Sequence, residues 1–154
     1  MTLPTIAVVG GTGNLGAAIA WRLARAGYFV VVGSRAEESA RKGADELGHG
    51  LRGAANSDAA AKADIVIVTV PFAAQEATLA DIAPHVAGKL VVDTTVPLVP
   101  PRVMRVQLPP EGSAALKAQA ILGVPPDGMF GPFTRRAVVD FQQRHELLPD
   151  GIVG

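Results

Sequence analysis

The sequence predicts an α/β fold, a doubly wound parallel sheet followed by a short helical C-terminal segment. Short, continuously apolar runs such as "DIVIVTV" alternate with helix-like segments over residues 5–122. Such runs are typical of strands buried on both faces, as in a parallel sheet covered by helices. From residue 124 on the alternation stops, and Gly, Pro and Asp-Gly pairs punctuate the chain. These two observations separate the sheet from the segment that follows it.

Each element can be placed from the apolar runs and the residues that end them. Strands are predicted at residues 5–9, 28–33, 51–55, 64–70 and 89–96, of which 51–55 is the weakest. Helices are predicted at residues 13–26, 34–47, 56–63, 75–85 and 113–122. In the first helix Leu15, Ile19 and Leu23 recur at i, i+4 and i+8, which predicts that they share an apolar face.

The composition excludes several classes of protein. With 14 basic and 14 acidic residues, the chain has no net charge to attract a nucleic acid or a membrane surface. The absence of cysteine excludes disulfides and thiolate metal ligands, and the three histidines show no metal-ligand spacing. No basic N-terminal region precedes the first apolar run, and no run approaches the roughly 20 residues of a membrane span. We therefore expect a cytoplasmic protein without a metal site.

The turn after the first strand carries "GGTGNLG", which fits the pattern G-x-G-x-x-G at Gly11, Gly13 and Gly16. The three glycines permit a tight turn, approach of the backbone to a pyrophosphate, and close packing of helix on strand. The phosphates then lie at the helix N-terminus, where free N–H groups attract anions. The motif alone is weak, but its place between a strand and a helix predicts a Rossmann-like dinucleotide site.

The end of the second strand indicates which dinucleotide binds. NAD sites place Asp or Glu there for the ribose 2′-hydroxyl, whereas this chain has "GSRAEE". Ser34 and Arg35 can hold a 2′-phosphate, which favours NADP(H). Ser34 and Glu37 also fit a capping box of the second helix, with Ser34 as the N-cap, and the two interpretations are compatible.

Four segments carry a family resemblance: "IAVVGGTGNLG", "VVVGSR", "ADIVIVTVPF" and "VVDTTVPLVPP". In this order they resemble the NADP-binding half of the deazaflavin-dependent NADP oxidoreductases, which use coenzyme F420. The resemblance covers about residues 4–123. It implies that NADP(H) is a cofactor and coenzyme F420 a possible co-substrate.

The same resemblance implies a set of cofactor-binding residues. Thr12, Asn14 and the adjacent Leu15 belong to the phosphate loop, and Ser34 and Arg35 hold the 2′-phosphate. Val70 and Pro71 lie along the nicotinamide, and Val96 and Pro97 lie where the two cofactors meet. Members of the family can place a lysine four residues after the arginine, but this chain has Ser39 there. Arg41 or Lys42 is then the cation left to substitute for that lysine at the 2′-phosphate.

No catalytic residue is predicted. Hydride transfer between two such cofactors requires the protein to hold two rings together and demands little acid–base chemistry. Asp93, at the end of the fifth strand, is interpreted as a carboxylate that bonds its loop rather than as a base. His49, His85 and His145 are interpreted as surface residues.

The last residues, "VPPDGMFGPFTRRAVVDFQQRHELLPDGIVG", resemble the small helical peptidoglycan-binding domain, in which D-G-x-x-G-x-x-T-x-x-A-V-x-x-F-Q recurs. That module begins with a helix ending in Q-x-x-L-G, which Gln119, Leu122 and Gly123 supply. We expect an NADP-binding domain at residues 1–123 and a partial turn–helix–turn at 124–154, sharing helix 113–122. The chain then resembles a fusion of incomplete parts of these two families.

Three functions stay open. The first is an NADP(H)-binding oxidoreductase of the deazaflavin type, with low turnover because the C-terminal half of that family is replaced. The second is a peptidoglycan-binding module on a Rossmann scaffold, against which the expected lack of a secretion signal counts. The third is a chimera without intact function. A homodimer through the exposed sheet edge or the C-terminal helix is a further expectation.

Overall fold

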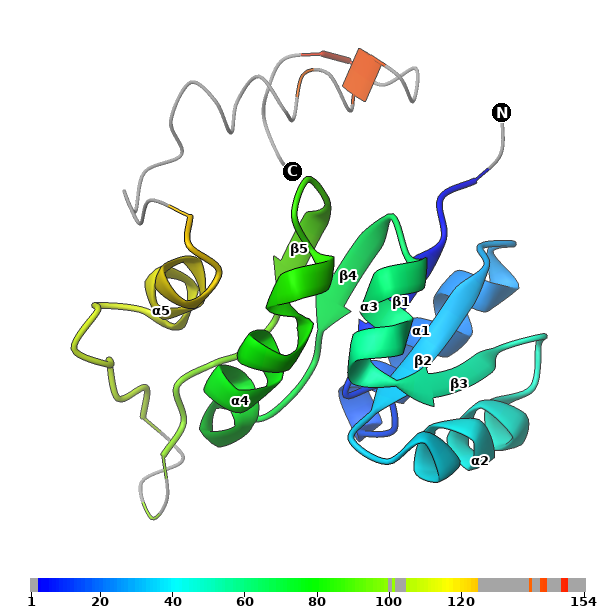
Figure 1. Cartoon of the computed structure of the whole chain (residues 1–154), viewed down its shortest axis with the longest axis horizontal. Helices are drawn as coiled ribbons and strands as arrows, with labels where there is room; N and C mark the ends of the chain where they lie inside the picture. The colour runs from blue at the N-terminus through cyan, green and yellow to red at the C-terminus, as the bar shows by residue number, and fades with distance from the viewer. Residues whose placement is uncertain are drawn as a thin grey trace.

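The structure is a computed structural model that describes residues 3–99, 101 and 105–124, with residues 139, 142, 143, 148 and 149 beyond them. Within these residues five parallel strands form one sheet in the order β3-β2-β1-β4-β5, with helices on both faces (Figure 1). The strands are β1 (Ile6–Val9), β2 (Val30–Ser34), β3 (Arg52–Ala55), β4 (Ile65–Val68) and β5 (Leu90–Asp93). The helices are α1 (Asn14–Arg25), α2 (Glu37–Leu47), α3 (Asn56–Lys62), α4 (Phe72–Ile82) and α5 (Ala114–Ile121), with a 3-10 turn η1 at Ala83–His85.

The strand order places a switch point in the middle of the sheet. The chain runs outward from β1 to β3, then returns to the other side of β1 for β4 and β5. In open α/β sheets of this kind, ligands bind outside the carboxyl ends of the strands where the order reverses. The crevice between the ends of β1 and β4 is therefore the place at which a site is expected.

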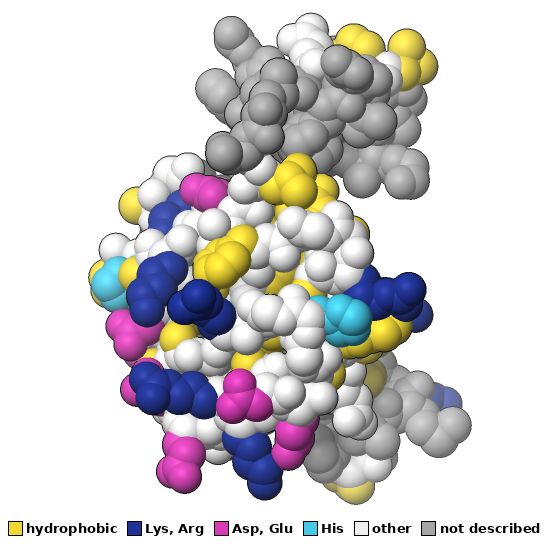
Figure 2. Space-filling model, turned by 90° about the vertical axis from the view of Figure 1, so that its right-hand side faces the viewer, with side chains coloured by type: hydrophobic (Ala, Val, Ile, Leu, Met, Phe, Trp, Pro, Cys, Tyr) yellow, Lys and Arg dark blue, Asp and Glu magenta, His cyan; other side chains and the backbone are white. Residues whose placement is uncertain are grey.

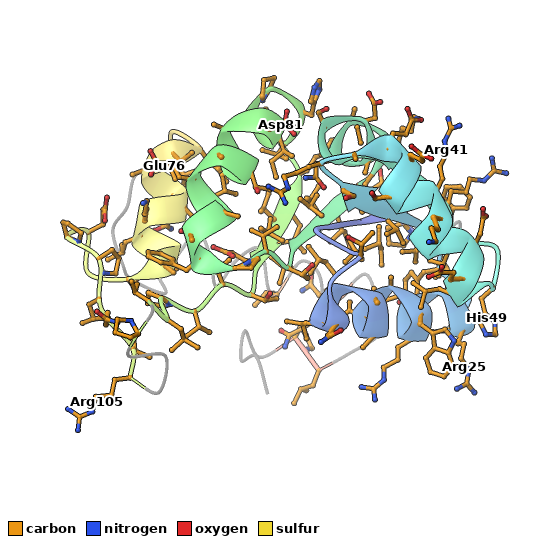
Figure 3. All side chains as sticks on the ribbon, turned by 90° about the horizontal axis from the view of Figure 1, so that it is seen from below. Arg25, Arg41, His49, Glu76, Asp81 and Arg105 are labelled. Atoms are coloured by element: carbon orange, nitrogen blue, oxygen red, sulfur yellow. The ribbon has the colours of Figure 1, made fainter. Side chains whose placement is uncertain are left out.

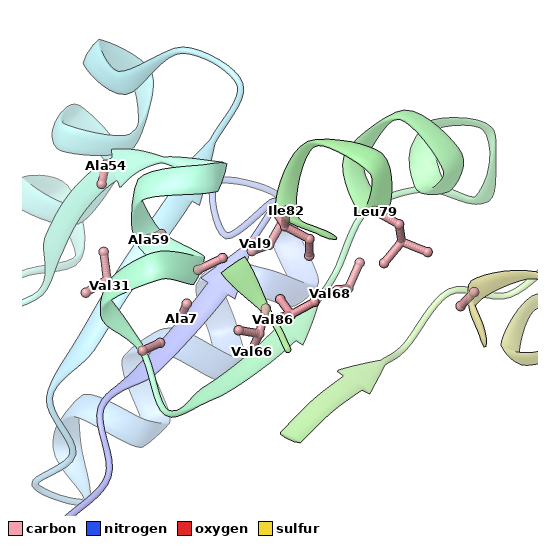
Figure 4. Close-up of a cluster of buried hydrophobic side chains, with 13 residues drawn as sticks. Ala7, Val9, Val31, Ala54, Ala59, Val66, Val68, Leu79, Ile82 and Val86 are labelled. Atoms are coloured by element: carbon pink, nitrogen blue, oxygen red, sulfur yellow. The ribbon is translucent and has the colours of Figure 1, made fainter. Parts of the chain in front are cut away.

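Two apolar layers hold the sheet between the helices. On one face Leu79 and Ile82 of α4 pack with Val66 and Val68 of β4 and with small residues of α3 and α5 (Figure 4). On the other face, Ala20 of α1 and Ala44 of α2 pack on alternate residues of β1 and β2. Burying both faces of the central strands requires the continuous apolar runs that the sequence contains.

Local signals set the helix ends. Gly27, with φ of +90°, follows the last turn of α1, which carries Arg22 and Arg25 beside its C-terminal carbonyls. The first turn of α5 is capped by Ser113, whose Oγ accepts the Leu116 amide at 3.0 Å. All five predicted strands and the five predicted helices are confirmed in kind, with ends that shift by a few residues.

Two details of the prediction are wrong. Leu15 is 53% exposed, because the first turn of α1 projects beyond the carboxyl edge of the sheet, and only Ile19 and Leu23 pack against the core. Ser34 does not cap α2: it continues β2 by pairing with Ala55 of β3, and the N-cap is Ala36, without a side-chain bond among the described residues. The predicted helix and turns of residues 125–154 lie outside the described residues, apart from the five isolated positions.

The surface over α2 and the β3 edge carries both signs of charge, interspersed (Figure 2). Along α2, Arg41 pairs with Glu37 at 2.6 Å and Lys42 lies 3.9 Å from Glu46. This mixture is what the balanced composition predicts. A search of the described helices finds none with the length and apolar character to cross a membrane.

Candidate functional site

A cavity of about 280 Å³ lies at the carboxyl edge of the sheet, at the switch point. It is formed by the turns that follow β1, β2, β3 and β4, together with the start of α4. Its lining residues are Gly10, Thr12, Gly13, Ser34, Arg35, Asn56, Thr69, Val70, Pro71, Ala74 and Thr78. The structure thus brings together six of the predicted site residues, namely Thr12, Gly13, Ser34, Arg35, Val70 and Pro71.

The glycine turn is packed too tightly for side chains except on the side of the cavity. A Cβ on Gly11 would lie 2.6 Å from the Val8 carbonyl oxygen, and one on Gly16 would lie 2.5 Å from Thr69 Oγ1. A Cβ on Gly13 would meet nothing closer than 3.5 Å, so this backbone faces open space. Gly10 has φ of +74°, and a Cβ there would lie 2.5 Å from Val70 Cγ1. Gly10 is a requirement of the turn that the motif does not include.

The N-terminus of α1 opens toward the same space. Its N-cap is Gly13, no side chain of the described residues caps it, and its first turn carries no acidic residue. The free amides and the helix dipole together favour an anion at this end. Asn14, Leu15, Gly11 and Gly16 belong to this turn without lining the cavity.

Ser34 is the last residue of β2 and Arg35 follows it, and both line the cavity together with Val70 and Pro71 from the turn after β4. Because Ser34 does not cap α2, its hydroxyl is left for another partner. Arg35 is exposed and makes no ion pair with a described residue. A hydroxyl and a guanidinium in a cavity whose lining has no carboxylate are suited to a phosphate.

The two cations that could replace the missing lysine lie elsewhere. Arg41 is engaged with Glu37 on the surface of α2 (Figure 3), and Lys42 faces Glu46. Neither residue lines the cavity. Within the described residues, Arg35 is therefore the one cation that lines it.

Asn56 is a site residue that the sequence reasoning missed. It is 3% exposed at the start of α3, and its Oδ1 accepts the Gly10 amide at 3.3 Å. Asn56 also packs closely against Gly33: a Cβ on Gly33 would lie 2.8 Å from Asn56 Oδ1. Its Nδ2 makes no hydrogen bond with a described residue, so it is a donor left beside Ser34 and Arg35. An asparagine directly after a strand, at the carboxyl edge, was the available signal.

Two threonines hold the turns after β4 and β5. Thr69 Oγ1 donates to the Val9 carbonyl at 2.8 Å, and Thr94 Oγ1 donates to the Val68 carbonyl at 2.8 Å. Each threonine thus ties the end of its strand to the end of the neighbouring strand, which fixes the two turns relative to each other. Sequence reasoning did not identify these residues.

Val96 and Pro97 lie beyond β5 and do not line the cavity. Val96 is 50% exposed, whereas Pro97 is buried and accepts the Gln107 amide at its carbonyl oxygen. Asp93 accepts the amide and hydroxyl of Thr95, which confirms it as a loop-bonding carboxylate. His49 and His85 are exposed, as predicted, and His145 lies outside the described residues.

A larger hollow of about 490 Å³ runs along β5 between η1 and α5, but it does not reach the glycine turn. The smaller cavity has the chemistry: free amides at a helix N-terminus, a hydroxyl, an amide donor and a guanidinium, with no carboxylate in its lining. This set fits the phosphates and ribose of a dinucleotide.

A family model and individual related proteins both match the N-terminal part of this chain, and they belong to the same family. The sequence model of the family described as "NADP oxidoreductase coenzyme F420-dependent" matches residues 5–97, and that of a peptidoglycan-binding domain matches residues 111–154. An F420-dependent NADP reductase of Methanothermobacter thermautotrophicus is 46% identical over 100 residues, covering 60% of this chain and 43% of the relative. One of Methanocaldococcus jannaschii is 33% identical over 129 residues, covering 76% of this chain and 57% of the relative.

A solved structure from Arthrobacter sp. FB24, assigned as an F420-dependent NADP reductase, superposes with a TM-score of 0.68 at 30% identity. The match covers 78% of this chain and 59% of the other. The chain spans about half the length of the curated relatives that it matches.

Proposed function

Since the chain belongs to the family of coenzyme F420-dependent NADP oxidoreductases, we propose that it binds NADP(H) at the carboxyl edge of its sheet and takes part in hydride transfer between NADP(H) and coenzyme F420. The observation that carries the proposal is the cavity itself. It joins the glycine turn to Ser34 and Arg35 and has no carboxylate in its lining. Relatives of the same family are named F420-dependent NADP reductases, which supports the choice of both cofactors.

The phosphates belong at the α1 N-terminus. Gly11, Thr12, Gly13, Asn14, Leu15 and Gly16 form this turn. The amides of Gly11 and Gly13 donate to the carbonyls of Gly33 and Gly10, so the other backbone amides of the turn would bind the pyrophosphate. At the adjoining end of the cavity, Ser34 and Arg35 would bind the 2′-phosphate, with the free Nδ2 of Asn56 within the same lining. An aspartate or glutamate at the end of β2 would repel that phosphate, and none is present.

The nicotinamide would follow the turns after β4 and β5. Val70 and Pro71 line the cavity on that side, and Val96 and Pro97 follow the neighbouring strand β5 outside the lining. The bound nicotinamide supplies the hydride chemistry. The side chains of this chain bind and orient the dinucleotide and exclude water from it, so no acid–base residue is required of them.

Titration with NADPH and NADH tests the proposal. Arg35→Ala removes a charge-assisted bond worth about 1.5–3 kcal/mol, so it should weaken NADPH about tenfold to a hundredfold and leave NADH nearly unchanged. Arg41→Ala is the matched control, because it removes the same charge from a residue that pairs with Glu37 outside the cavity. Equal losses for both cofactors, or an equal effect of Arg41→Ala, would remove Arg35 from the 2′-phosphate site.

Turnover is a separate matter from binding. Because the reductase family model ends at residue 97 and a peptidoglycan-binding model covers residues 111–154, we expect slow or no reduction of coenzyme F420 by NADPH with this chain alone. The absorbance change of the deazaflavin measures it. A rate in the range of about 1–10³ per second that complete enzymes reach would contradict the expectation.

Peptidoglycan binding is the second candidate, supported by the match over residues 111–154. That match begins before α5, which supports a helix shared by a domain of residues 1–123 and a segment of residues 124–154. We nonetheless assign the segment a structural part and expect no saturable sedimentation with insoluble peptidoglycan. Since the chain uses NADP(H) in this proposal, we place it in the cytoplasm, where that cofactor is held.

Self-association is the remaining proposal about partners. The edge strand β5 exposes Leu90 and Val92 and has one unpaired edge among the described residues, which is a surface that a second copy can cover. Sedimentation equilibrium over a range of concentrations would detect such a homodimer. The C-terminal helix is the alternative contact, and a Val92→Lys variant that still dimerises would favour it.

A further inference from the structure

Gln75 is a fully buried amide that connects three elements. It lies on α4 with no exposed surface. Its Nε2 lies 2.6 Å from Asp93 Oδ2, 2.7 Å from Thr95 Oγ1 and 3.0 Å from the Ala114 carbonyl oxygen, and its two hydrogens serve two of these three acceptors at a time. Its Oε1 is buried without a hydrogen-bond partner among the described residues. A buried amide in this state is costly, so packing alone does not account for a glutamine at this position.

Asp93 and Thr95 close a ring with Gln75. Asp93 Oδ1 accepts the Thr95 amide at 3.0 Å and the Thr95 hydroxyl at 2.7 Å. The same hydroxyl accepts from Gln75, so the three side chains hold one another. Because a backbone amide is part of the ring, the ring fixes the main chain at Thr95 as well as its side chain.

Residues 94–97 include Thr95 of this ring, and they are the segment proposed above to lie at the nicotinamide end of the cofactor. Thr94, on one side of Thr95, is tied to the Val68 carbonyl by both its amide and its hydroxyl. Val96 and Pro97 follow directly. None of Gln75, Asp93 and Thr95 lines the cavity that contains Ser34, Arg35 and Asn56. The ring therefore lies outside the cavity and can act on the site only through the segment that it holds.

Resting on the proposed function, we propose that Gln75, Asp93 and Thr95 are positioning residues, a buried latch that holds residues 94–97 where they meet the nicotinamide end of the dinucleotide. The latch acts through the main chain of the segment and touches no part of the adenosine end. Loosening it lowers the affinity for the whole dinucleotide and spares the affinity for its adenosine half.

The test compares two ligands by calorimetry: NADPH, and adenosine 2′,5′-bisphosphate, which has the 2′-phosphate but no nicotinamide. Thr95→Val keeps the shape of the side chain and removes the hydroxyl. It should weaken NADPH about tenfold, the effect of losing about 1.4 kcal/mol, and change the bisphosphate by less than about twofold. Thr95→Ser, which keeps the hydroxyl, should restore NADPH binding. The emission of bound NADPH should shift toward that of the free cofactor in Thr95→Val and not in Thr95→Ser.

Leu79→Ala is the control for a purely structural effect. Leu79 is fully buried on the same helix as Gln75 and has no part in the ring, so its loss should lower the melting temperature without changing the ratio of the two affinities. Gln75→Leu is the second latch variant and should follow Thr95→Val.

The possible failures can be told apart. If Thr95→Val and Gln75→Leu leave the ratio of affinities unchanged while the native chain binds both ligands, the latch is overturned and the dinucleotide site stands. If the native chain binds neither ligand, the dinucleotide site itself is overturned, and the latch with it.

Discussion

The two ends of the sheet differ in how far they are covered, although their strands read alike in the sequence. Val32, Val8, Ile67 and Val92 form one row across β2, β1, β4 and β5 on the face that α1 and α2 cover. Val32 and Val8 are fully buried, whereas Val92 is 39% exposed. In the next row Val30 is 2% exposed and Leu90 54%. The apolar run of a buried strand is present in β5, but among the described residues the cluster under α1 and α2 extends only as far as Ile65 and Ile67 of β4 on this face.

The covered end is also the end at which the proposed phosphate-binding residues lie. The glycine turn, Ser34, Arg35 and Asn56 all follow β1, β2 or β3. These residues depend on helices packed closely on strands, as at Gly53, where a Cβ would lie 2.2 Å from the backbone of α2. The residues proposed to bind the phosphates thus follow the covered strands, and the β5 end retains apolar surface for another contact.

The largest predicted effect tests the packing at the covered end. Gly53→Ala would force a methyl group into the backbone of Ala40 and Arg41, which cannot move without displacing α2, so we expect a loss of more than about 3 kcal/mol in the free energy of unfolding. Gly88→Ala is the matched change at the β5 end. Gly88 has φ of +74° but open space around it, so its cost is that of the backbone conformation alone, about 1–2 kcal/mol. Urea denaturation measures both, and equal losses would contradict the contrast.

The second largest effect on the free energy of unfolding is expected from two valines in the same row of the sheet. Val32→Ala removes fully buried methyl groups and should cost about 1.5–3 kcal/mol, whereas Val92→Ala, at the exposed end of the row, should cost less than about 0.5 kcal/mol. The difference in denaturation midpoint at low protein concentration is the measurement. If the cost of Val92→Ala rises with protein concentration, β5 is covered by a second copy in solution.

The sequence predicted the order of the elements well because apolar periodicity is a local property. It also predicted the glycine turn and the Ser34–Arg35 pair, since both directly follow strands in the chain. The capping box failed for a non-local reason: pairing with Ala55 keeps Ser34 in the strand, and nothing near Ser34 in the sequence announces that partner.

Asn56 and Gln75 were missed for a related reason. A polar residue can be recognised as part of a site only when its burial is known. Burial of Asn56 against Gly10 and Gly33 depends on three turns meeting in space. Gln75 lies 18 residues from Asp93 and 39 from Ala114, distances over which a single sequence gives no pairing signal. Leu15 shows the opposite error: helical periodicity placed it on the apolar face, but periodicity cannot tell where the sheet beneath the helix ends, and the residue is exposed.

The smallest predicted effect concerns the contact that ties the two ends of the sheet together. Lys89, at the start of β5, donates from Nζ to the carbonyls of Ala60 and Ala61 at 2.8 and 3.0 Å, in the last turn of α3. A cation at a helix C-terminus satisfies free carbonyls and complements the dipole, so Lys89→Met should lower the free energy of unfolding by about 1 kcal/mol. Lys42→Met is the control, because this amine lies 3.9 Å from Glu46 on the exposed surface and should contribute less than about 0.5 kcal/mol. Denaturation at low and high salt separates them further: the Lys89 contribution should persist at high salt because its hydrogen bond to Ala60 is part-buried, and its disappearance there would show that β5 is joined to α3 by packing alone.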